Sequence, residues 1–116
     1  MKIALCGSTR FKDQFHEWNQ KLSKLGHVVY SVASFGHSGD PLSAEEKIVL
    51  DLVHLRKIIE SDAIFIVGWQ TDLHTLYVGE STSREIIWAR MLGKRIFKLD
   101  PFAIRGFSED DRVLAI

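Results

Sequence analysis

Cysteine and net charge are both scarce in this sequence. Cys6 is the only cysteine, which excludes an intrachain disulfide and a cluster of thiolate ligands around a metal ion. Lysine plus arginine and aspartate plus glutamate number 15 each, so the formal net charge is zero. A balanced charge provides no general field to hold a nucleic-acid polymer or an anionic membrane surface. A phosphate group would therefore have to be bound locally.

Long apolar runs are also missing. The apolar part of the N-terminal segment MKIALCGSTRF is too short for a signal peptide or a membrane span, so we expect a cytoplasmic protein. The length of 116 residues predicts a single domain over residues 1–116. Hydrophobic residues make up 46% of the chain, which is enough for a packed interior.

Short apolar runs and amphipathic segments alternate along the chain. Continuous apolar runs predict four buried strands, at residues 2–8, 27–35, 63–69 and 95–99. Apolar residues at helical spacing, with capping or glycine signals, predict three helices, at residues 10–25, 43–61 and 83–92. The helix at 43–61 begins with a Ser43–Glu46 capping box, and its expected buried stripe is Ile48, Leu52, Leu55 and Ile59. Beyond residue 99 we expect a loop with a short helix or an edge strand.

This order of elements predicts the fold class. Apolar strands that alternate with helices are typical of a parallel sheet covered on both faces. We therefore expect a three-layer, flavodoxin/Rossmann-like α/β fold with a four- to five-stranded, mainly parallel sheet. Ligands of such sheets bind beyond the carboxyl ends of the strands. Three segments fall at that edge and predict the site, residues 7–10, 35–41 and 70–82.

The junction CGSTR between the first strand and the first helix has the chemistry of an anion site. Gly7 permits close backbone approach, the hydroxyls of Ser8 and Thr9 can donate hydrogen bonds, and Arg10 adds a positive charge. Alternatively, Ser8 or Thr9 only caps the helix and Arg10 is solvated. The spacing matches neither a dinucleotide-binding fingerprint nor a P-loop.

The segment VGEST repeats this arrangement at the start of the helix at 83–92. Gly79 is followed by the hydroxyls of Ser81 and Thr82. Two helix N-termini at the same edge of a parallel sheet could direct their dipoles at one anion. The pair of junctions therefore favours a phosphorylated ligand over a merely structural pair of caps.

Two carboxylates lie near the same edge. Glu85 stands three residues after Thr82, and by spacing alone the pair is a capping box. Asp51 and His54 share one face of the helix at 43–61, offset from its apolar stripe. By itself that pattern favours a solvated charge with a local partner.

Three blocks together resemble the nucleoside 2-deoxyribosyltransferase superfamily: CGSTR, DLVHLRKIIESDAIFIV and YVGESTSREIIWARMLGKRI. Within it the chain is similar to the branch that includes the deoxynucleoside 5′-monophosphate N-glycosidases, and to short bacterial and phage members of unassigned function. The resemblance covers about residues 2–99, and the last block is its most specific part.

The resemblance implies roles for these residues. Glu85 falls on the catalytic nucleophile, and Asp51 on the aspartate that serves proton transfer to the departing base. It implies that the 5′-phosphate is contacted from both junctions, by Gly7, Ser8, Arg10, Gly79 and Ser81. It also implies a homodimer or higher homo-oligomer in which a neighbouring subunit completes the site. The family usually has a strand-one tyrosine where this chain has Ala4, which leaves His54, Tyr77 and Trp69 as candidates to support Glu85.

The function we expect is cleavage or transfer at the N-glycosidic bond of a (deoxy)nucleoside 5′-monophosphate-like substrate. One alternative is a non-catalytic nucleotide-binding sensor on the same fold, and another is an interaction domain in which Glu85 is only a cap. No cofactor is expected. Metal use is not expected either, because the five histidines lack a paired ligand spacing, although His37 and Asp40 share a loop.

Overall fold

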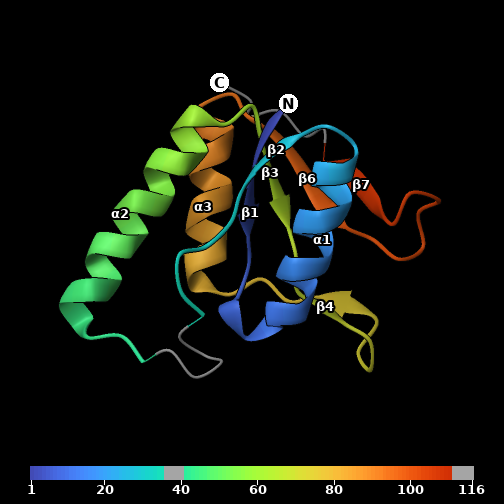
Figure 1. Cartoon of the computed structure of the whole chain (residues 1–116). Helices are drawn as coiled ribbons and strands as arrows, with labels where there is room; N and C mark the ends of the chain where they lie inside the picture. Colours follow the sequence, from blue (N-terminus) through green and yellow to red (C-terminus); the bar gives the residue numbers. More distant parts are fainter. Residues whose placement is uncertain (36–40, 111–116) are drawn as a thin grey trace.

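The computed structural model describes residues 1–35 and 41–110 (Figure 1). Most of the predicted 35–41 segment, with His37 and Asp40, lies outside the described residues, as do residues 111–116. A five-stranded sheet forms the middle layer, in the order β2-β1-β3-β6-β7. Its strands are β1 Lys2–Cys6, β2 Val28–Tyr30, β3 Ala63–Ile66, β6 Arg95–Leu99 and β7 Phe107–Asp110. The first four are parallel and β7 is antiparallel to β6.

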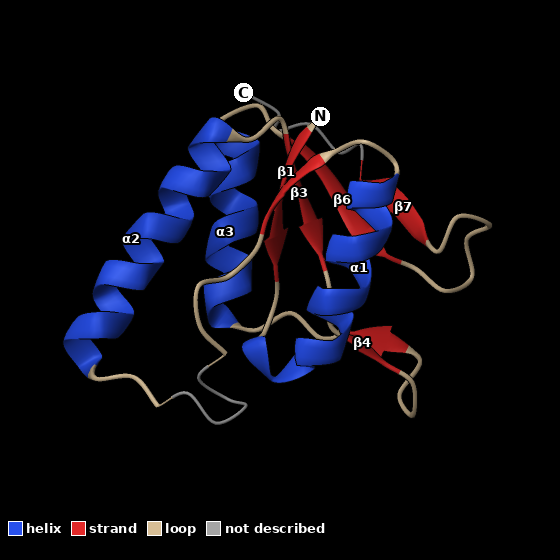
Figure 2. Cartoon of the chain, in the orientation of Figure 1, coloured by secondary structure: helices blue, strands red, loops and turns tan. Residues whose placement is uncertain are grey.

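Helices cover both faces of this sheet (Figure 2). On one face lies α1, Lys12–Lys24, preceded by the 3-10 turn Thr9–Phe11; on the other lie α2, Ala44–Glu60, and α3, Glu80–Met91. The three-layer, mainly parallel α/β fold predicted from the sequence is therefore confirmed. The predicted tail element is the edge strand β7, whose Phe97–Glu109 register fixes it beside β6.

Two apolar cores hold the layers together. Phe15, Trp18 and Leu22 of α1 pack against one face of the sheet, with Phe65 of β3 stacked on Trp18 at 4.9 Å between ring centroids. On the other face, Ile58 of α2 and Ala89 of α3 pack in a second core with Ile64 and Ile66 of β3. The alternation of side chains along each buried strand thus supplies both cores at once.

The predicted buried stripe of α2 is wrong. Ile48, Leu52 and Ile59 are 61%, 59% and 47% exposed, whereas His54 and Ile58 are buried. The capping box that begins the helix is present, with the Glu46 amide donating to Ser43 Oγ. Helical periodicity identifies the most apolar face of α2. The face that packs toward the sheet is instead the adjacent, partly polar one.

The connection predicted at residues 70–80 contains a small hairpin. Strands β4, Trp69–Gln70, and β5, Thr75–Leu76, pair antiparallel and stand beyond the main sheet. Strand β3 accordingly ends at Ile66, three residues earlier than expected. In the described part of the chain no helix is long and apolar enough to span a membrane.

Candidate active site

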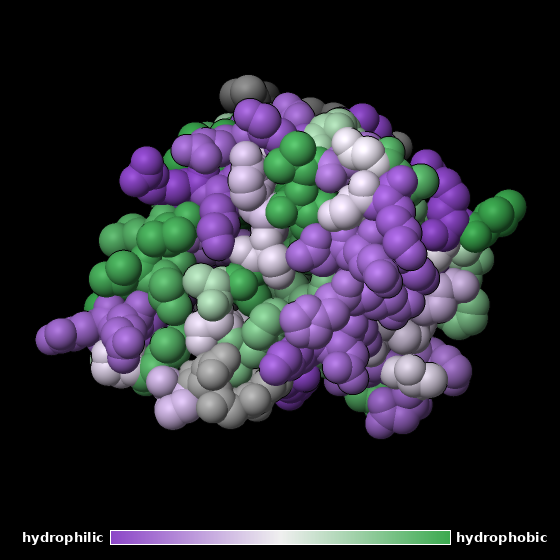
Figure 3. Space-filling model, in the orientation of Figure 1, coloured by the Kyte–Doolittle hydropathy of each residue, from purple (hydrophilic) through white to green (hydrophobic). Residues whose placement is uncertain are grey.

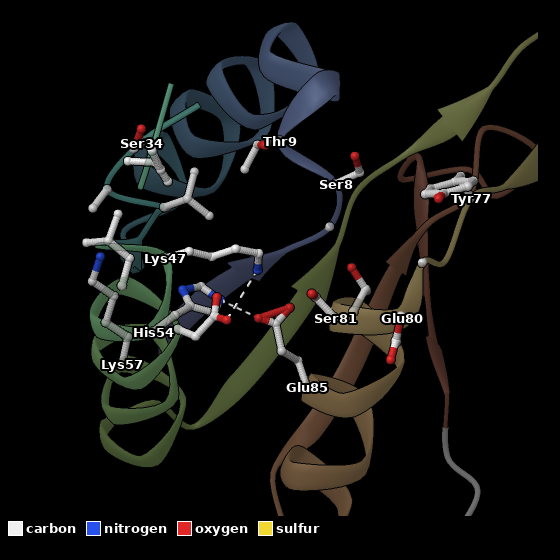
Figure 4. Close-up of a pocket in the computed structure, with 18 residues that line it drawn as sticks. Ser8, Thr9, Ser34, Lys47, His54, Lys57, Tyr77, Glu80, Ser81 and Glu85 are labelled. Carbon is white, nitrogen blue, oxygen red and sulfur yellow. Dashed lines mark hydrogen bonds and ion pairs between the residues drawn. The ribbon is translucent and has the colours of Figure 1, made fainter. Parts of the chain in front are cut away.

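A cavity of about 420 Å³ opens at the carboxyl ends of β1 and β3, the edge predicted to hold the site. Its walls come from the loop after β1, the loop after β2, the polar face of α2 and the first turns of α3 (Figure 4). The predicted site residues that line it are Gly7, Ser8, Thr9, Asp51, His54, Tyr77, Gly79, Ser81, Thr82 and Glu85. The fold therefore places the two strand-to-helix junctions and the carboxyl groups of Asp51 and Glu85 around one cavity.

Arg10 is the predicted site residue that does not line this cavity. Its guanidinium lies 4.0 Å from the centre of the Tyr77 ring and 5.1 Å from that of Phe11. It borders a separate depression together with Gln14 and Trp69. Its assignment as a phosphate ligand stays a prediction, whereas its observed contact is a cation–π stack.

Gly7 is required by the backbone at this point. Its φ is +145°, and a Cβ there would lie 2.6 Å from the carbonyl oxygen of Val67. No other residue fits without strain, so the loop after β1 passes directly over the end of β3. Ser8 then caps the 3-10 turn, its Oγ accepting from the Arg10 amide at 3.5 Å. The capping alternative for Ser8 is thus realised, although its side chain also faces the cavity.

The predicted capping box at Thr82 and Glu85 is wrong. Helix α3 begins at Glu80 with Gly79 as its N-cap, and no side chain caps it. Thr82 is already inside the helix and is only 2% exposed. Glu85 therefore lies in the second turn, too far along the helix to bond back to the N-cap. Its carboxyl group instead reaches across to α2.

His54 is the partner of Glu85 in the described structure. Its Nε2 lies 3.3 Å from Glu85 Oε2, and the two side chains are 10% and 14% exposed (Figure 4). Burial and the charge of Asp51 raise the pKa of Glu85 to about 7, against smaller opposing effects of Arg84 and Lys47. Glu85 therefore holds a proton part of the time at neutral pH, as expected for a desolvated carboxyl group.

The imidazole of His54 stays neutral in this environment. Burial, and then the charge of Lys57, lower its pKa to about 4. The approach to Glu85 is accordingly a close polar contact and not an ion pair at neutral pH. The same Nε2 lies 3.5 Å from the Sγ of Cys6, and Nδ1 is buried with no hydrogen-bond partner among the described residues.

Asp51 lines the cavity one turn before His54 on α2. Its Oδ2 accepts from Lys47 Nζ at 3.3 Å, and its side chain is 43% exposed. The local-partner reading of Asp51 is thus correct, but the partner is Lys47. Its charge also contributes to the raised pKa of Glu85, so the two carboxyl groups interact.

Several lining residues were missed in the sequence. These include Lys47 and Lys57, which bring positive charge to the α2 wall. Glu80, which belongs to the predicted 70–82 segment, brings negative charge to the first turn of α3. Lys57 is held in place by donating to the Ser31 carbonyl at 2.8 Å. The remaining wall is made by small and apolar side chains, Val32, Ala33, Ser34, Leu42 and Leu50. Helical spacing from Asp51 would have found Lys47, but nothing local points to residues 32–34.

Tyr77 and Trp69, the other proposed supports for Glu85, have different contacts. The Tyr77 ring lies against Gly79, the N-cap residue of α3, and is stacked by the Arg10 guanidinium. Trp69 begins the β4–β5 hairpin, and its ring packs edge-on against Phe102. Among the three candidates, His54 is the one with a contact to the Glu85 carboxyl group.

The chemistry available here is that of an acid pair beside hydrogen-bond donors. Glu85 presents a partly ionised carboxyl group, and Asp51 lines the same cavity with a second carboxyl group, which is bonded to Lys47. Figure 4 shows Ser8 and Thr9 across the pocket from Glu85, and Ser81 beside Glu85 on α3. Such an arrangement can bind a polar ligand at one end and act on it as nucleophile or acid at the other.

Comparisons with known proteins identify the fold. No protein-family model matches the chain, and no match was found among curated proteins. One similar solved structure is the 2-deoxyribosyltransferase of the psychrotolerant bacterium Bacillus psychrosaccharolyticus, with 23% identity and a TM-score of 0.65 over 87% of this chain and 73% of that one. Another is the CMP N-glycosidase of Clostridium botulinum, with 20% identity and a TM-score of 0.52 over 83% of this chain and 66% of that one. At these identities the likeness establishes that the chain shares the α/β fold of a deoxyribosyltransferase and an N-glycosidase.

Proposed function

We propose that this chain is an enzyme of the nucleoside 2-deoxyribosyltransferase-like superfamily, in the branch that handles nucleotides. It cleaves the bond between base and sugar in a (deoxy)nucleoside 5′-monophosphate and passes the sugar to water or to a second base. The observation that carries the proposal is the meeting of Glu85 and Asp51 in one cavity with the loops at Gly7–Thr9 and Gly79–Thr82. The fold shared with two enzymes of this chemistry supports it.

Glu85 acts as the nucleophile. Its ionised carboxylate attacks C1′ of the sugar, the C1′–N bond breaks, and the bonding electrons leave with the base. The developing positive charge on the sugar ring is stabilised by the carboxylate beneath it. Water or a second base then attacks C1′ of the glycosyl ester, the Asp51 carboxylate takes up the proton that the attacking group loses, and the Glu85 carboxylate is regenerated.

Asp51 handles the proton of the departing base. A nucleobase leaves poorly as an anion, so a proton delivered to a ring nitrogen as the bond breaks lowers the barrier. Asp51 is on the cavity side of α2, one turn from His54 and within electrostatic reach of Glu85. Its contact with Lys47 Nζ at 3.3 Å holds the carboxyl group in the cavity wall.

His54 positions the nucleophile. The family's tyrosine position is occupied here by Ala4, which is fully buried and offers no hydroxyl. The neutral imidazole of His54 contacts the carboxyl group in its place, with Nε2 3.3 Å from Glu85 Oε2. A fixed carboxylate under C1′ removes part of the entropic barrier to attack, an effect that can reach several kcal/mol.

The phosphate end of the substrate lies between the two junctions. The backbone amides at the start of α3, with the hydroxyls of Ser8 and Ser81, are donors for phosphate oxygens. Glu80 opposes an anion there because its charge is on the same turn. The helix dipole and the hydroxyl donors must therefore outweigh one repulsive carboxylate.

We further propose that the active form is a homodimer or higher homo-oligomer. The outward face of α2 is apolar along its length, with Ile48, Val49, Leu52 and Ile59 each about half exposed or more. Figure 3 shows apolar residues gathered on the surface over this helix. A patch of this kind on a chain without net charge is typical of an interaction surface.

The test of the enzyme is release of free base. Purified protein is incubated with a panel of deoxynucleoside and nucleoside 5′-monophosphates, in the presence of a metal chelator, and the products are separated by chromatography. We expect free base from at least one substrate, and none above background from Glu85→Gln. Glu17→Gln, which removes an exposed charge on α1, is the matched control and retains full activity.

Binding without turnover would point to the sensor alternative, which is favoured by the missing tyrosine hydroxyl at Ala4. Thermal shift with each monophosphate separates the two functions. A ligand that raises the melting temperature of both wild type and Glu85→Gln, with no base released by either, would replace the enzymatic proposal with a nucleotide-binding one.

A further inference from the structure

Three potential metal ligands from three different elements meet beside the cavity. Cys6 ends β1, His54 is on the inner face of α2, and Glu85 is in the second turn of α3. The thiol sulphur, one imidazole nitrogen and one carboxylate oxygen all lie within 4.8 Å of one another. Figure 4 shows His54 and Glu85 directed toward each other across the pocket.

The distances match the edges of a tetrahedral zinc site. Zinc bonds of about 2.3 Å to sulphur and about 2.0–2.1 Å to nitrogen and oxygen give ligand-to-ligand distances of roughly 3.3–3.6 Å. Here Cys6 Sγ lies 3.5 Å from His54 Nε2, and Nε2 lies 3.3 Å from Glu85 Oε2. Two of the three edges thus have the required length, and rotation of the Glu85 carboxyl group can adjust the third.

Hydrogen bonding does not tie the three groups to one another. An uncharged imidazole Nε2 either donates one proton or accepts one, so it can bond one of its two neighbours at a time. The Cys6 thiol has a separate acceptor in the Ala4 carbonyl oxygen, at 3.9 Å. A cation between the three groups would be bound by all of them.

The donor set also selects the ion. A thiolate and an imidazole are ligands for zinc and not for magnesium or calcium, which prefer oxygen. A thiolate and a carboxylate together supply two negative charges to a dication, and the neutral imidazole supplies a lone pair. The positive charges of Lys47 and Arg84 also act on Glu85. They repel a cation bound there and so weaken the site.

We propose that Cys6, His54 and Glu85 form a binding site for Zn²⁺, with the fourth position open to the cavity and filled by water or ligand. Three protein ligands and one open position are the usual pattern of an accessible zinc site. The bound ion holds the Glu85 carboxylate, so Zn²⁺ inhibits the enzyme by occupying its nucleophile. The binding site itself follows from geometry, and only the inhibition rests on the proposed function.

Binding is tested with Zn²⁺ alone, in the absence of any substrate. Chelator-treated, dialysed protein is titrated with Zn²⁺ against a chromophoric chelator, and we expect one ion per chain. In Cys6→Ser the dissociation constant should be weaker by about 100-fold or more, a larger loss than a change outside the ligands produces. His16→Gln, which removes an exposed imidazole on α1, binds Zn²⁺ like the wild type. Equal affinity in Cys6→Ser and wild type, or no one-to-one complex, would overturn the site.

Co²⁺ gives a second measurement that does not depend on a variant folding. A cobalt–thiolate bond has an ultraviolet charge-transfer band, and Cys6 is the chain's only thiol. We expect this band in the Co²⁺ form and its loss on adding Zn²⁺. A Co²⁺ complex without the band would contradict a site that includes Cys6.

Inhibition is then measured as base release with and without Zn²⁺. We expect Zn²⁺ to suppress the wild type and to leave Cys6→Ser active. Suppression of both to the same extent would contradict inhibition through this site. If chelated wild-type protein releases no base at all, the proposed function fails while the Zn²⁺ titration still decides the site.

Discussion

His54 Nε2 and Glu85 Oε2 lie 3.3 Å apart, which joins α2 to α3 across the cavity. Neither element alone fixes the carboxyl group, since no side chain of the described residues caps α3 and the Glu85 carboxyl group reaches across to α2. The orientation of the proposed nucleophile thus depends on a residue 31 positions earlier in the chain, as the sequence numbering shows.

Replacing His54 tests this positioning. We expect His54→Leu to lower kcat by about tenfold or more, equivalent to about 1.4 kcal/mol of lost transition-state stabilisation, with little change in KM. His54→Gln keeps an N–H donor and should retain more of the activity than His54→Leu. Both are assayed in chelator, which removes any bound metal. Equal losses in the two variants, or a change in KM alone, would show that the imidazole has only a packing role.

Proton transfer by Asp51 can be tested by comparing substrates with different leaving groups. Asp51→Asn should slow release of a natural base by about 100-fold, within the usual range for a general acid. A substrate whose leaving group departs readily as an anion needs no proton and should lose far less. Lys47→Gln is the comparison, because it removes the contact to Asp51 but leaves the carboxyl group. An equal loss on both kinds of substrate would argue against proton transfer by Asp51.

The residues that bind the phosphate group of the substrate can be identified by comparing KM for a nucleotide with KM for the corresponding nucleoside. Ser81 lines the cavity, whereas Arg10 stacks on Tyr77 outside it. Ser81→Ala should raise KM for the monophosphate about tenfold, the effect of losing about 1.4 kcal/mol of hydrogen bonding to an anion. It should leave KM for the nucleoside unchanged. Arg10→Gln should have the smaller effect on the monophosphate, and a larger one would assign the phosphate to Arg10.

Gly7 is expected to be essential for stability. Gly7→Ala places a Cβ 2.6 Å from the Val67 carbonyl oxygen in a backbone conformation with φ of +145°. We expect a loss of about 2–4 kcal/mol in the free energy of unfolding, from backbone strain and overlap together. Gly26→Ala also has a positive φ but meets no atom within 4 Å, so it should lose about 1 kcal/mol. Urea unfolding measures both, and similar midpoints would contradict the overlap.

The outward face of α2 should carry the subunit contact. Leu52 is 59% exposed in a helix whose opposite face lines the cavity. We expect wild-type protein to sediment as a dimer or larger assembly and Leu52→Glu to sediment as a monomer, because a buried unpaired charge disfavours association. Gln20→Glu on α1 is the control and should keep the wild-type state. A wild-type protein that sediments as a monomer would contradict the proposed homo-oligomer.

The sequence was sufficient for the fold and for the edge where the site lies. Continuous apolar runs predicted the four parallel strands, because a strand covered on both faces has no polar side to show. The positions of Gly7 and Gly79 after those strands then placed both junctions at the carboxyl edge. Glu85 and Asp51 were identified by resemblance, and both line the cavity there.

The tertiary structure alone decided which face of α2 is buried and which side chains meet. Periodicity identifies the apolar face of a helix, but the sheet and α3 determine the face that is covered, and here it carries His54 and Ile58, with Asp51 at its border on the cavity. The start of α3 at Glu80 likewise removed a capping box that spacing favoured. The meeting of Cys6, His54 and Glu85 spans three elements separated by many residues, so no local spacing could reveal it. Local patterns depend on neighbours within a turn or a strand, whereas a site depends on how the crossovers bring distant turns together.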